Sequence, residues 1–243
     1  MMKKGKIIVI EGTDCSGKET QSTRLVERLN QHGISAQLIG FPRYHTATGQ
    51  IIGGPYLGKP AISECWFSGG SNSVDPRVAS AYYAADRRAA LPEINNILNS
   101  GAHLVLDRYV SANMGHQGGK IKDPEERLEF YKDLDTLEHE FMQLPRPDLT
   151  LFLYMPYEIG MEMKKGMNEA PDGHERDPNH LKNAEEAYLQ LSEMNNWTRI
   201  DSEPFVNLES PETGISLASN VIFSKVINFL GKDKCSIVTN KII

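Results

Sequence analysis

The stretch IIVIEGTDCSGKETQ, residues 7–21, constrains the fold more than any other part of the sequence. An apolar run leads directly into a loop that begins at Gly12 and ends in Gly17-Lys18, and a helical pattern follows over 18–32. The pattern G-x-x-x-x-G-K arises by chance in roughly one chain in ten of this length, but its place between a strand and a helix is typical of a phosphate-binding loop. The backbone N–H groups of such a loop hold phosphates, and its lysine reaches their outer oxygens. The stretch therefore predicts a nucleotide site.

The residue after Lys18 departs from this pattern, because Glu19 stands where a serine or threonine hydroxyl normally ligates Mg²⁺. A carboxylate is a suitable ligand for this hard cation, but it is longer and adds negative charge beside a polyphosphate. Two interpretations are open. Either Glu19 itself ligates the metal, or it points away and Thr20 or water completes the metal shell.

Continuous apolar runs alternate with helical patterns along the chain, which predicts an α/β fold with a five-stranded parallel sheet and helices on both faces. Pro92 lies inside one helical pattern and predicts a kink there. The expected strands cover 6–11, 36–40, 103–107, 148–155 and 198–201, and the expected helices cover 18–32, 46–57, 76–100, 124–143, 157–165, 179–195 and 213–230.

The 243 residues suit a single nucleotide-binding domain, which we place at 1–231. A Gly- and Ser-rich segment at 58–76 and a charged segment at about 164–179 are expected to be long loops, and the second is a candidate mobile lid. Residues 232–243 are expected to form a flexible tail.

The composition favours a cytoplasmic protein that binds small molecules. The three cysteines are isolated and form no C-x-x-C pair, which indicates a reducing compartment and neither disulfides nor a zinc site. The net charge of −6 and the lack of a long basic run disfavour a nucleic acid polymer as a partner. No apolar run approaches the length of a membrane span, and the N-terminal one is interpreted as a buried strand rather than a signal peptide.

Five blocks in order resemble the thymidylate kinases, a family of phosphate-loop nucleoside monophosphate kinases, and the resemblance covers about 5–201. The blocks are EGTDCSGKETQ (11–21), FPRYHTATGQII (41–52), YYAADRR (82–88), LVLDRYVSANMGHQGGK (104–120) and GHERD (173–177). The resemblance implies Mg²⁺-dependent transfer of the ATP γ-phosphoryl group to a pyrimidine deoxynucleoside monophosphate, with dTMP as the expected acceptor. Family members are commonly dimers, so a homodimer is also implied. The implied ATP-binding residues are Gly12, Asp14, Cys15, Ser16, Gly17, Lys18, Glu19 and Thr20.

Two alternatives stay open at this point. The same architecture serves kinases for dUMP, a modified dUMP, a ribonucleotide or a nucleoside. A nucleotide-binding protein that has lost turnover is the other alternative, because of Glu19 and of Cys15, which stands where one group of the family has an arginine. Retention of Lys18, Asp107 and Arg108 argues against the second alternative.

The resemblance also implies residues around the monophosphate. Tyr83 and Arg87, four apart on one helix face, match the aromatic that stacks on thymine and the arginine that reads its carbonyl oxygen. Asn113 matches the position that faces the pyrimidine N3, and His116 stands where an aromatic residue usually lies near the sugar. The remaining implied contacts are Asp14 with the sugar 3′-hydroxyl, Arg108 with phosphates, Gln117 with either the base or the turn, and Phe41, Pro42 and Arg43 near the monophosphate. The family arginine usually follows one residue later than Arg43, so a solvated surface arginine is the alternative for that residue.

Three residues are expected to be catalytic: Lys18, Arg108 and, in the lid, Arg176, which we favour over Lys164 and Lys165. Asp107 ends an apolar strand, where a carboxylate can hold Mg²⁺ through water beside the glycine loop. A helix cap is the alternative role for Asp107. The functional role is favoured because ligands bind at the carboxyl ends of parallel strands.

Overall fold

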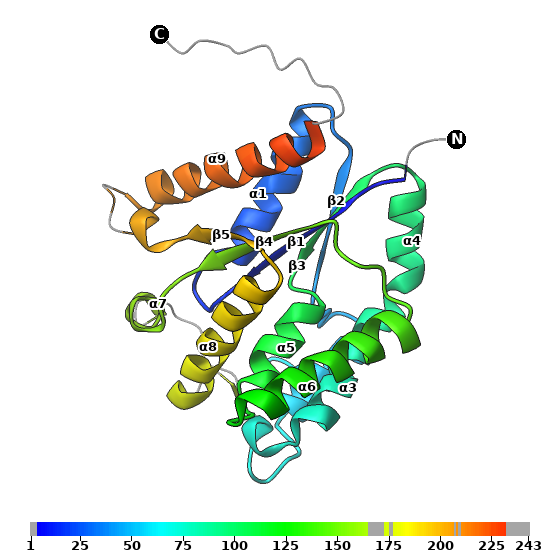
Figure 1. The fold of residues 1–243 in the computed structure, drawn as a ribbon, viewed down its shortest axis with the longest axis vertical. Coiled ribbons are helices and arrows are strands. Elements are labelled where there is room, and N and C mark those ends of the chain that lie inside the picture. Colours follow the sequence, from blue (N-terminus) through cyan, green and yellow to red (C-terminus); the bar gives the residue numbers. More distant parts are fainter. Residues whose placement is uncertain (1–3, 165–172, 175–176, 207, 209, 232–243) are drawn as a thin grey trace.

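Five parallel strands form one sheet in the order β2-β3-β1-β4-β5 (Figure 1). The computed structural model of the protein describes residues 4–164, 173–174, 177–206, 208 and 210–231. The strands are β1 (Ile7–Gly12), β2 (Ala36–Gly40), β3 (His103–Asp107), β4 (Leu149–Tyr154) and β5 (Thr198–Asp201). All five expected strands are confirmed within a residue or so at either end, and the parallel α/β sheet is confirmed with them.

Helices cover both faces of the sheet. Alternate residues of β1 point to opposite sides: Ile8 and Ile10 pack against α1 and α9, whereas Ile7 and Val9 pack against α4. The helices in chain order are α1 (Lys18–Gln31), α2 (Ala47–Ile51), α3 (Pro76–Ala89), α4 (Leu91–Asn99), α5 (Val110–Gly118), α6 (Pro124–Asp135), α7 (Tyr157–Lys164), α8 (Pro178–Met194) and α9 (Pro211–Leu230). Shorter turns are η1 (Ile52–Tyr56), η2 (Ser71–Ser73), η3 (Thr136–Phe141) and η4 (Glu203–Phe205).

Three of the expected helices are each divided into two elements. The helical pattern at 76–100 forms α3 and α4, which meet at Ala90, and Pro92 lies in the first turn of α4, where its missing N–H leaves no helical bond unmade. The patterns at 46–57 and 124–143 begin as α-helix and continue as the π-helical turns η1 and η3. The segment 58–76 forms a loop, as expected, apart from the short turn η2.

Helix α5 was not expected, because its sequence VSANMGHQG is poor in strong helix formers. Its glycines are explained by close packing. A Cβ atom on Gly115 would lie 2.7 Å from the ring of Tyr188 on α8, and one on Gly118 would lie 2.5 Å from the ring of Tyr131 on α6. Helix α5 is thus held between α6 and α8, below the sheet in Figure 1.

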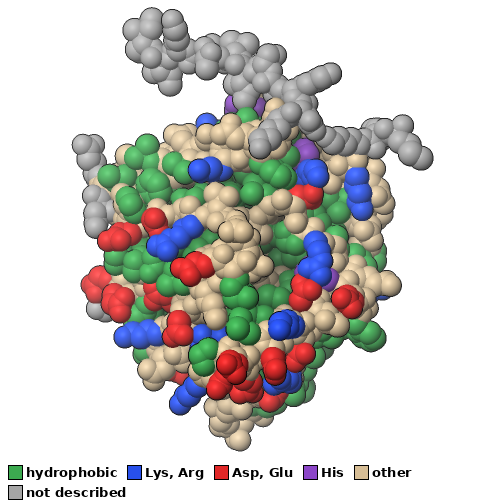
Figure 2. Space-filling view, viewed as in Figure 1, with side chains coloured by type: hydrophobic (Ala, Val, Ile, Leu, Met, Phe, Trp, Pro, Cys, Tyr) green, Lys and Arg blue, Asp and Glu red, His purple; other side chains and the backbone are tan. Residues whose placement is uncertain are grey.

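One helix among the described residues, α9, is long and apolar enough to cross a membrane by length and composition alone, contrary to the expectation that no run approaches that length. It packs against α1, and its Ile222, Phe223 and Val226 belong to the core on one face of the sheet. Core helices pass the same compositional test, so α9 is weak support for a membrane span. Figure 2 shows acidic and basic side chains interspersed over the face in view, with no continuous basic patch on that face.

Candidate functional site

The phosphate-binding loop joins β1 to α1 and is fastened to the end of β4. Gly12 leaves no room for a side chain, since a Cβ atom there would lie 2.3 Å from the Leu153 carbonyl oxygen. The Thr13 hydroxyl donates to the Met155 carbonyl and accepts from its N–H, at 2.7 and 2.8 Å. Gly17 begins the helix at a φ of 83°, a left-handed conformation that favours glycine. The sequence pattern therefore has the strand–loop–helix context that phosphate binding requires.

Lys18 is buried, with 7% of its surface exposed. Its amino group donates to the Thr13 carbonyl at 2.6 Å. Burial, and then the charge of Arg108, lower the pKa of Lys18 to about 8, whereas Asp14 and Asp107 act in the opposite direction. A phosphate anion beside this amine would favour its charged form.

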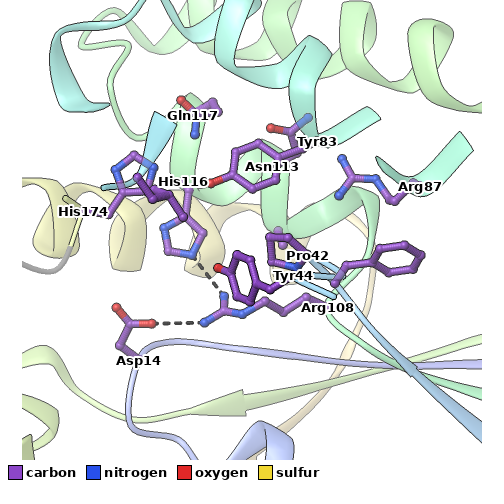
Figure 3. A pocket seen from close by; sticks show the side chains of 13 residues that line it. Asp14, Pro42, Tyr44, Tyr83, Arg87, Arg108, Asn113, His116, Gln117 and His174 are labelled. Carbon is purple, nitrogen blue, oxygen red and sulfur yellow. Dashed lines mark hydrogen bonds and ion pairs between the residues drawn. The ribbon is translucent and has the colours of Figure 1, made fainter. Parts of the chain in front are cut away.

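At the end of β3, Asp107 and Arg108 face the loop. Arg108 has a φ of 63°, in the left-handed region where a non-glycine residue is strained, and such strain clusters at functional sites. Its guanidinium lies between two side chains, 3.2 Å from Asp14 Oδ1 and 3.1 Å from His116 Nε2 (Figure 3). Burial is the largest single influence on Asp14 and opposes its ionisation, but the neighbouring charges, Arg108 first among them, together outweigh burial and hold the pKa of this carboxyl well below its usual range.

A cavity that is partly open to solvent lies beside Arg108 and encloses about 620 Å³ of space, the open part included. Figure 3 shows Asp14 and Arg108 toward one end and Arg87 and Asn113 toward the other. Most of the residues predicted to bind the monophosphate line this cavity together: Asp14, Phe41, Pro42, Tyr83, Arg87, Arg108, Asn113, His116 and Gln117. Tyr44, Leu57, Ala112 and His174 line it as well and were not assigned a role in the site from the sequence.

Arg43 is absent from the lining of this cavity. Its backbone N–H donates to Asp86 at 2.8 Å, and its guanidinium donates to Glu93 at 3.2 Å. It is 9% exposed, so it is not a solvated surface arginine either. Tyr44, at the sequence position where the family usually has its arginine, lines the cavity. A phosphate role for Arg43 stays a prediction that this geometry does not support.

Gly173 and His174, two described residues of the predicted lid segment, contact the loop at 58–76 and the two residues before it. Asn72 Oδ1 lies 2.5 Å from His174 Nδ1, and the Tyr56 hydroxyl lies 3.2 Å from His174 Nε2. The Gly173 N–H donates to the Leu57 carbonyl at 3.0 Å. These contacts hold His174 in the lining of the cavity, whereas Lys165 and Arg176 lie outside the described residues.

Two buried carboxylates that were not predicted from the sequence support the site. Glu11 is fully buried, and its Oε1 accepts from the Tyr109 N–H and the Ser111 hydroxyl, both at 2.9 Å. It thereby fixes the turn that carries Arg108. Glu138, on η3, accepts from Arg87 and Asn113. Glu11 could have been predicted as a buried functional carboxylate, because it is a charged residue inside an apolar strand. Glu138 gave no such signal, because in the sequence it stands where an amphipathic helix would have an exposed polar residue.

The residues fit a magnesium ion held mainly by nucleotide phosphates and water. Asp107 Oδ1 is buried and has no hydrogen-bond partner among the described residues. Burial raises the pKa of Asp107, and Arg108 and Lys18 oppose the shift. Within the described part of the chain, no cluster of three or more His, Cys, Asp or Glu side chains would hold a metal by itself. One or two carboxylates are what Mg²⁺ needs beside substrate phosphates.

Mild acid is expected to destabilise the fold through His116 and His174. Burial lowers the pKa of both well below 6.5, with further contributions from Arg108 at His116 and from the neighbouring imidazoles at His174. The unfolded chain binds these protons at its ordinary pKa near 6.5, so stability is lost as the pH falls below that value. The free energy of unfolding should drop by about 1 kcal/mol per histidine between pH 6.5 and 5.5.

Urea denaturation at these two pH values measures the effect. His174→Gln keeps hydrogen-bonding groups facing Asn72 and Tyr56 but cannot titrate, so it should weaken the pH dependence. His45→Gln, at an exposed position, is the matched control and should leave the dependence unchanged. Equal unfolding midpoints of the wild type at both pH values would contradict this prediction.

Comparison with known proteins agrees with the geometry. The thymidylate kinase family model matches residues 10–209. Human thymidylate kinase is 31% identical over 204 residues, which cover 82% of this chain and 84% of that protein. Thymidylate kinase from Prochlorococcus marinus (strain NATL2A) is 31% identical over 202 residues, which cover 82% of this chain and 89% of that protein.

A similar fold occurs in the solved structure of thymidylate kinase from Candida albicans. It aligns with a TM-score of 0.64 at 22% identity and covers 92% of this chain and 93% of that one. The matched family region holds the phosphate-binding loop, the Asp107-Arg108 strand end and the cavity beside them. This chain belongs to the thymidylate kinase family.

Proposed function

We propose that the protein transfers the γ-phosphoryl group of ATP to the 5′-phosphate of dTMP and so forms dTDP and ADP. One observation carries the proposal: the strained Arg108 lies between the phosphate-binding loop, which holds the buried Lys18, and a cavity lined by most of the residues predicted to bind the monophosphate. The relatives named above support the choice of dTMP. Members of this family use ATP as the donor, generally with Mg²⁺.

The proposed chemistry is positioning and charge neutralisation without a covalent intermediate. Lys18 and the loop N–H groups would hold the donor phosphates, and Arg108 would reach the phosphates of acceptor and transferred group through its planar fork. Arg176 is the proposed lid arginine. No general base is needed, because the attacking phosphate oxygen is already ionised.

Asp107 is the proposed protein contact of Mg²⁺, with Thr20 or Glu19 as the alternatives for a second one. An ion held by these residues would supply positive charge that neutralises the donor phosphates. Both Glu19 and Thr20 are exposed in the first turn of α1. Exposure favours the interpretation in which Glu19 points to solvent.

Glu19→Ala is therefore expected to be nearly silent. An exposed substitution of this kind changes energies by less than about 0.5 kcal/mol, so the Mg²⁺ concentration for half-maximal rate should shift by no more than about twofold. Mg²⁺ titrations at saturating ATP measure it, with Glu19→Ser as the matched variant that restores the usual hydroxyl. A clear rise in the half-maximal concentration for Glu19→Ala, reversed in Glu19→Ser, would instead make Glu19 a metal ligand.

A coupled assay of ADP release across a panel of acceptors tests the proposed function. The panel contains dTMP, dUMP, dCMP, UMP and thymidine, each with ATP and Mg²⁺. The highest kcat/KM is expected with dTMP. A preference for another acceptor would identify a different kinase. Binding of ATP with no ADP release in the presence of any acceptor would identify a protein that has lost turnover.

The remaining proposals concern the setting of the enzyme. We retain a cytoplasmic location and a homodimer joined through helices beside the sheet, with neither a nucleic acid polymer nor a membrane as a partner. The one-domain division at 1–231 is also retained, and the tail at 232–243 lies outside the described residues.

A further inference from the structure

The base end of the cavity is backed by the carboxylate of Glu138. This side chain is completely buried, and it comes from the π-helical turn η3, which follows α6. Its Oε2 accepts from Arg87 Nε at 2.5 Å, and its Oε1 accepts from Arg87 Nη2 and from Asn113 Nδ2, the latter at 3.1 Å. A single carboxylate thus contacts two residues that line the cavity.

These contacts determine which way the Asn113 amide faces. Its nitrogen lies 3.2 Å from the Ser80 carbonyl oxygen and 3.1 Å from Glu138. Both partners only accept hydrogen bonds, so the amide nitrogen must face them and Oδ1 must face elsewhere. Oδ1 is buried and has no hydrogen-bond partner among the described residues, although Asn113 lines the cavity. A buried acceptor without a partner calls for a donor from the ligand.

Arg87 contributes the opposite polarity at the same end. Two of its nitrogens are taken by Glu138, so the planar guanidinium is fixed in orientation, and all of its groups are donors. It is 1% exposed and lines the cavity beside Asn113 (Figure 3). The base end therefore offers one fixed acceptor next to fixed donors.

We infer that Glu138 is a positioning residue that sets this polarity and thereby makes the site select a pyrimidine with an N3–H donor beside a 4-oxo acceptor. A 4-amino pyrimidine presents the reverse order, an acceptor at N3 and a donor at the neighbouring exocyclic group. Its N3 acceptor would face the Asn113 acceptor, and its amino donor would face the Arg87 donors. The inference rests on the proposed function, because it assumes that a monophosphate occupies this cavity.

The test compares the selectivity of the wild type with that of Glu138→Gln. A glutamine of the same shape presents an N–H₂ group on one side, so it no longer forces the Asn113 nitrogen and the Arg87 fork into one arrangement. The ratio of kcat/KM for dTMP to that for dCMP should fall by about ten- to hundredfold. The KM for ATP should stay the same, since the phosphate-binding loop is untouched.

Dissociation constants of dTMP and dCMP, measured by calorimetry without ATP, separate this inference from the proposed function. If no acceptor turns over but dTMP still binds more tightly than dCMP, and the preference shrinks in Glu138→Gln, the proposed function fails and the inference stands. If both substrates weaken equally in Glu138→Gln, Glu138 is only structural and the inference is overturned. A wild type that binds both nucleotides equally well also overturns it.

A second variant keeps the inference testable if Glu138→Gln does not fold. Asn113→Ala leaves both Arg87 contacts of Glu138 in place and removes the acceptor itself. It should lose most of the preference for dTMP over dCMP, and an unchanged preference would overturn the inference. Where both variants fold, Glu138→Gln should have a smaller effect on selectivity in the Asn113→Ala background than in the wild type.

Discussion

Replacing Lys18 with alanine should lower kcat by about 10²–10³-fold or more. The side chain is buried, and its amino group donates to the Thr13 carbonyl within the loop that is proposed to hold the donor phosphates. Removing one preorganised charge from a transition state costs rate on this scale. Steady-state assays of ADP release at saturating dTMP and ATP measure the loss.

The burial of Lys18 requires a control for folding. Lys18→Met retains the aliphatic stem and should be as inactive as the alanine variant while it unfolds at nearly the wild-type temperature. Lys132→Ala removes an exposed lysine on α6 and should keep full activity. Near-normal turnover of Lys18→Ala would remove the assignment of the phosphate-binding loop.

Arg108→Lys should lower kcat by about 10²-fold, although it keeps the charge. The guanidinium contacts Asp14 with one nitrogen and His116 with another, so two side chains fix its plane. A lysine has a point charge without a fork, and it cannot hold two phosphate oxygens in the same geometry. The effect should appear in kcat with both substrates saturating.

The lysine variant is preferred to alanine as the main test because it keeps the reach and charge of the arginine, while the strained backbone at this position stays occupied by a long side chain. Arg146→Lys, at an exposed arginine paired with Asp135, is the matched control and should be fully active. Activity of Arg108→Lys within about twofold of wild type would show that a single charge suffices and that the fork has no role.

The sheet was predictable because its chemistry is local. A strand buried on both faces needs a continuous apolar run, and β1, β3 and β4 contain such runs at 7–10, 104–106 and 151–153. The nucleotide loop was predictable for a similar reason, since its glycine and lysine positions are fixed by spacing. Most of the expected cavity residues lie together because they come directly after the ends of these strands or lie on the neighbouring helix α3.

The supporting groups were not predictable, because they depend on contacts between distant parts of the chain. Arg87 and Glu138 are 51 positions apart, and only the packing of α3 against α5 and η3 brings them together. Helix α5 was missed because glycines that weaken a helix in isolation become favourable once Tyr131 and Tyr188 lie against them. Contacts with Asp86 and Glu93 hold Arg43 outside the cavity, and no sequence motif indicates these two partners.

The glycine packing of α5 has a consequence for inhibitor design. At Gly119 a Cβ atom would lie 2.8 Å from the backbone of Asn183, so α5 has no slack toward α8, the helix that follows the lid. A compound too bulky for the base end therefore cannot gain space by displacing α5, because that movement would press on α8 as well. Substituents should instead be directed toward Pro42 and Tyr44, which line the same cavity from the chain between β2 and α3.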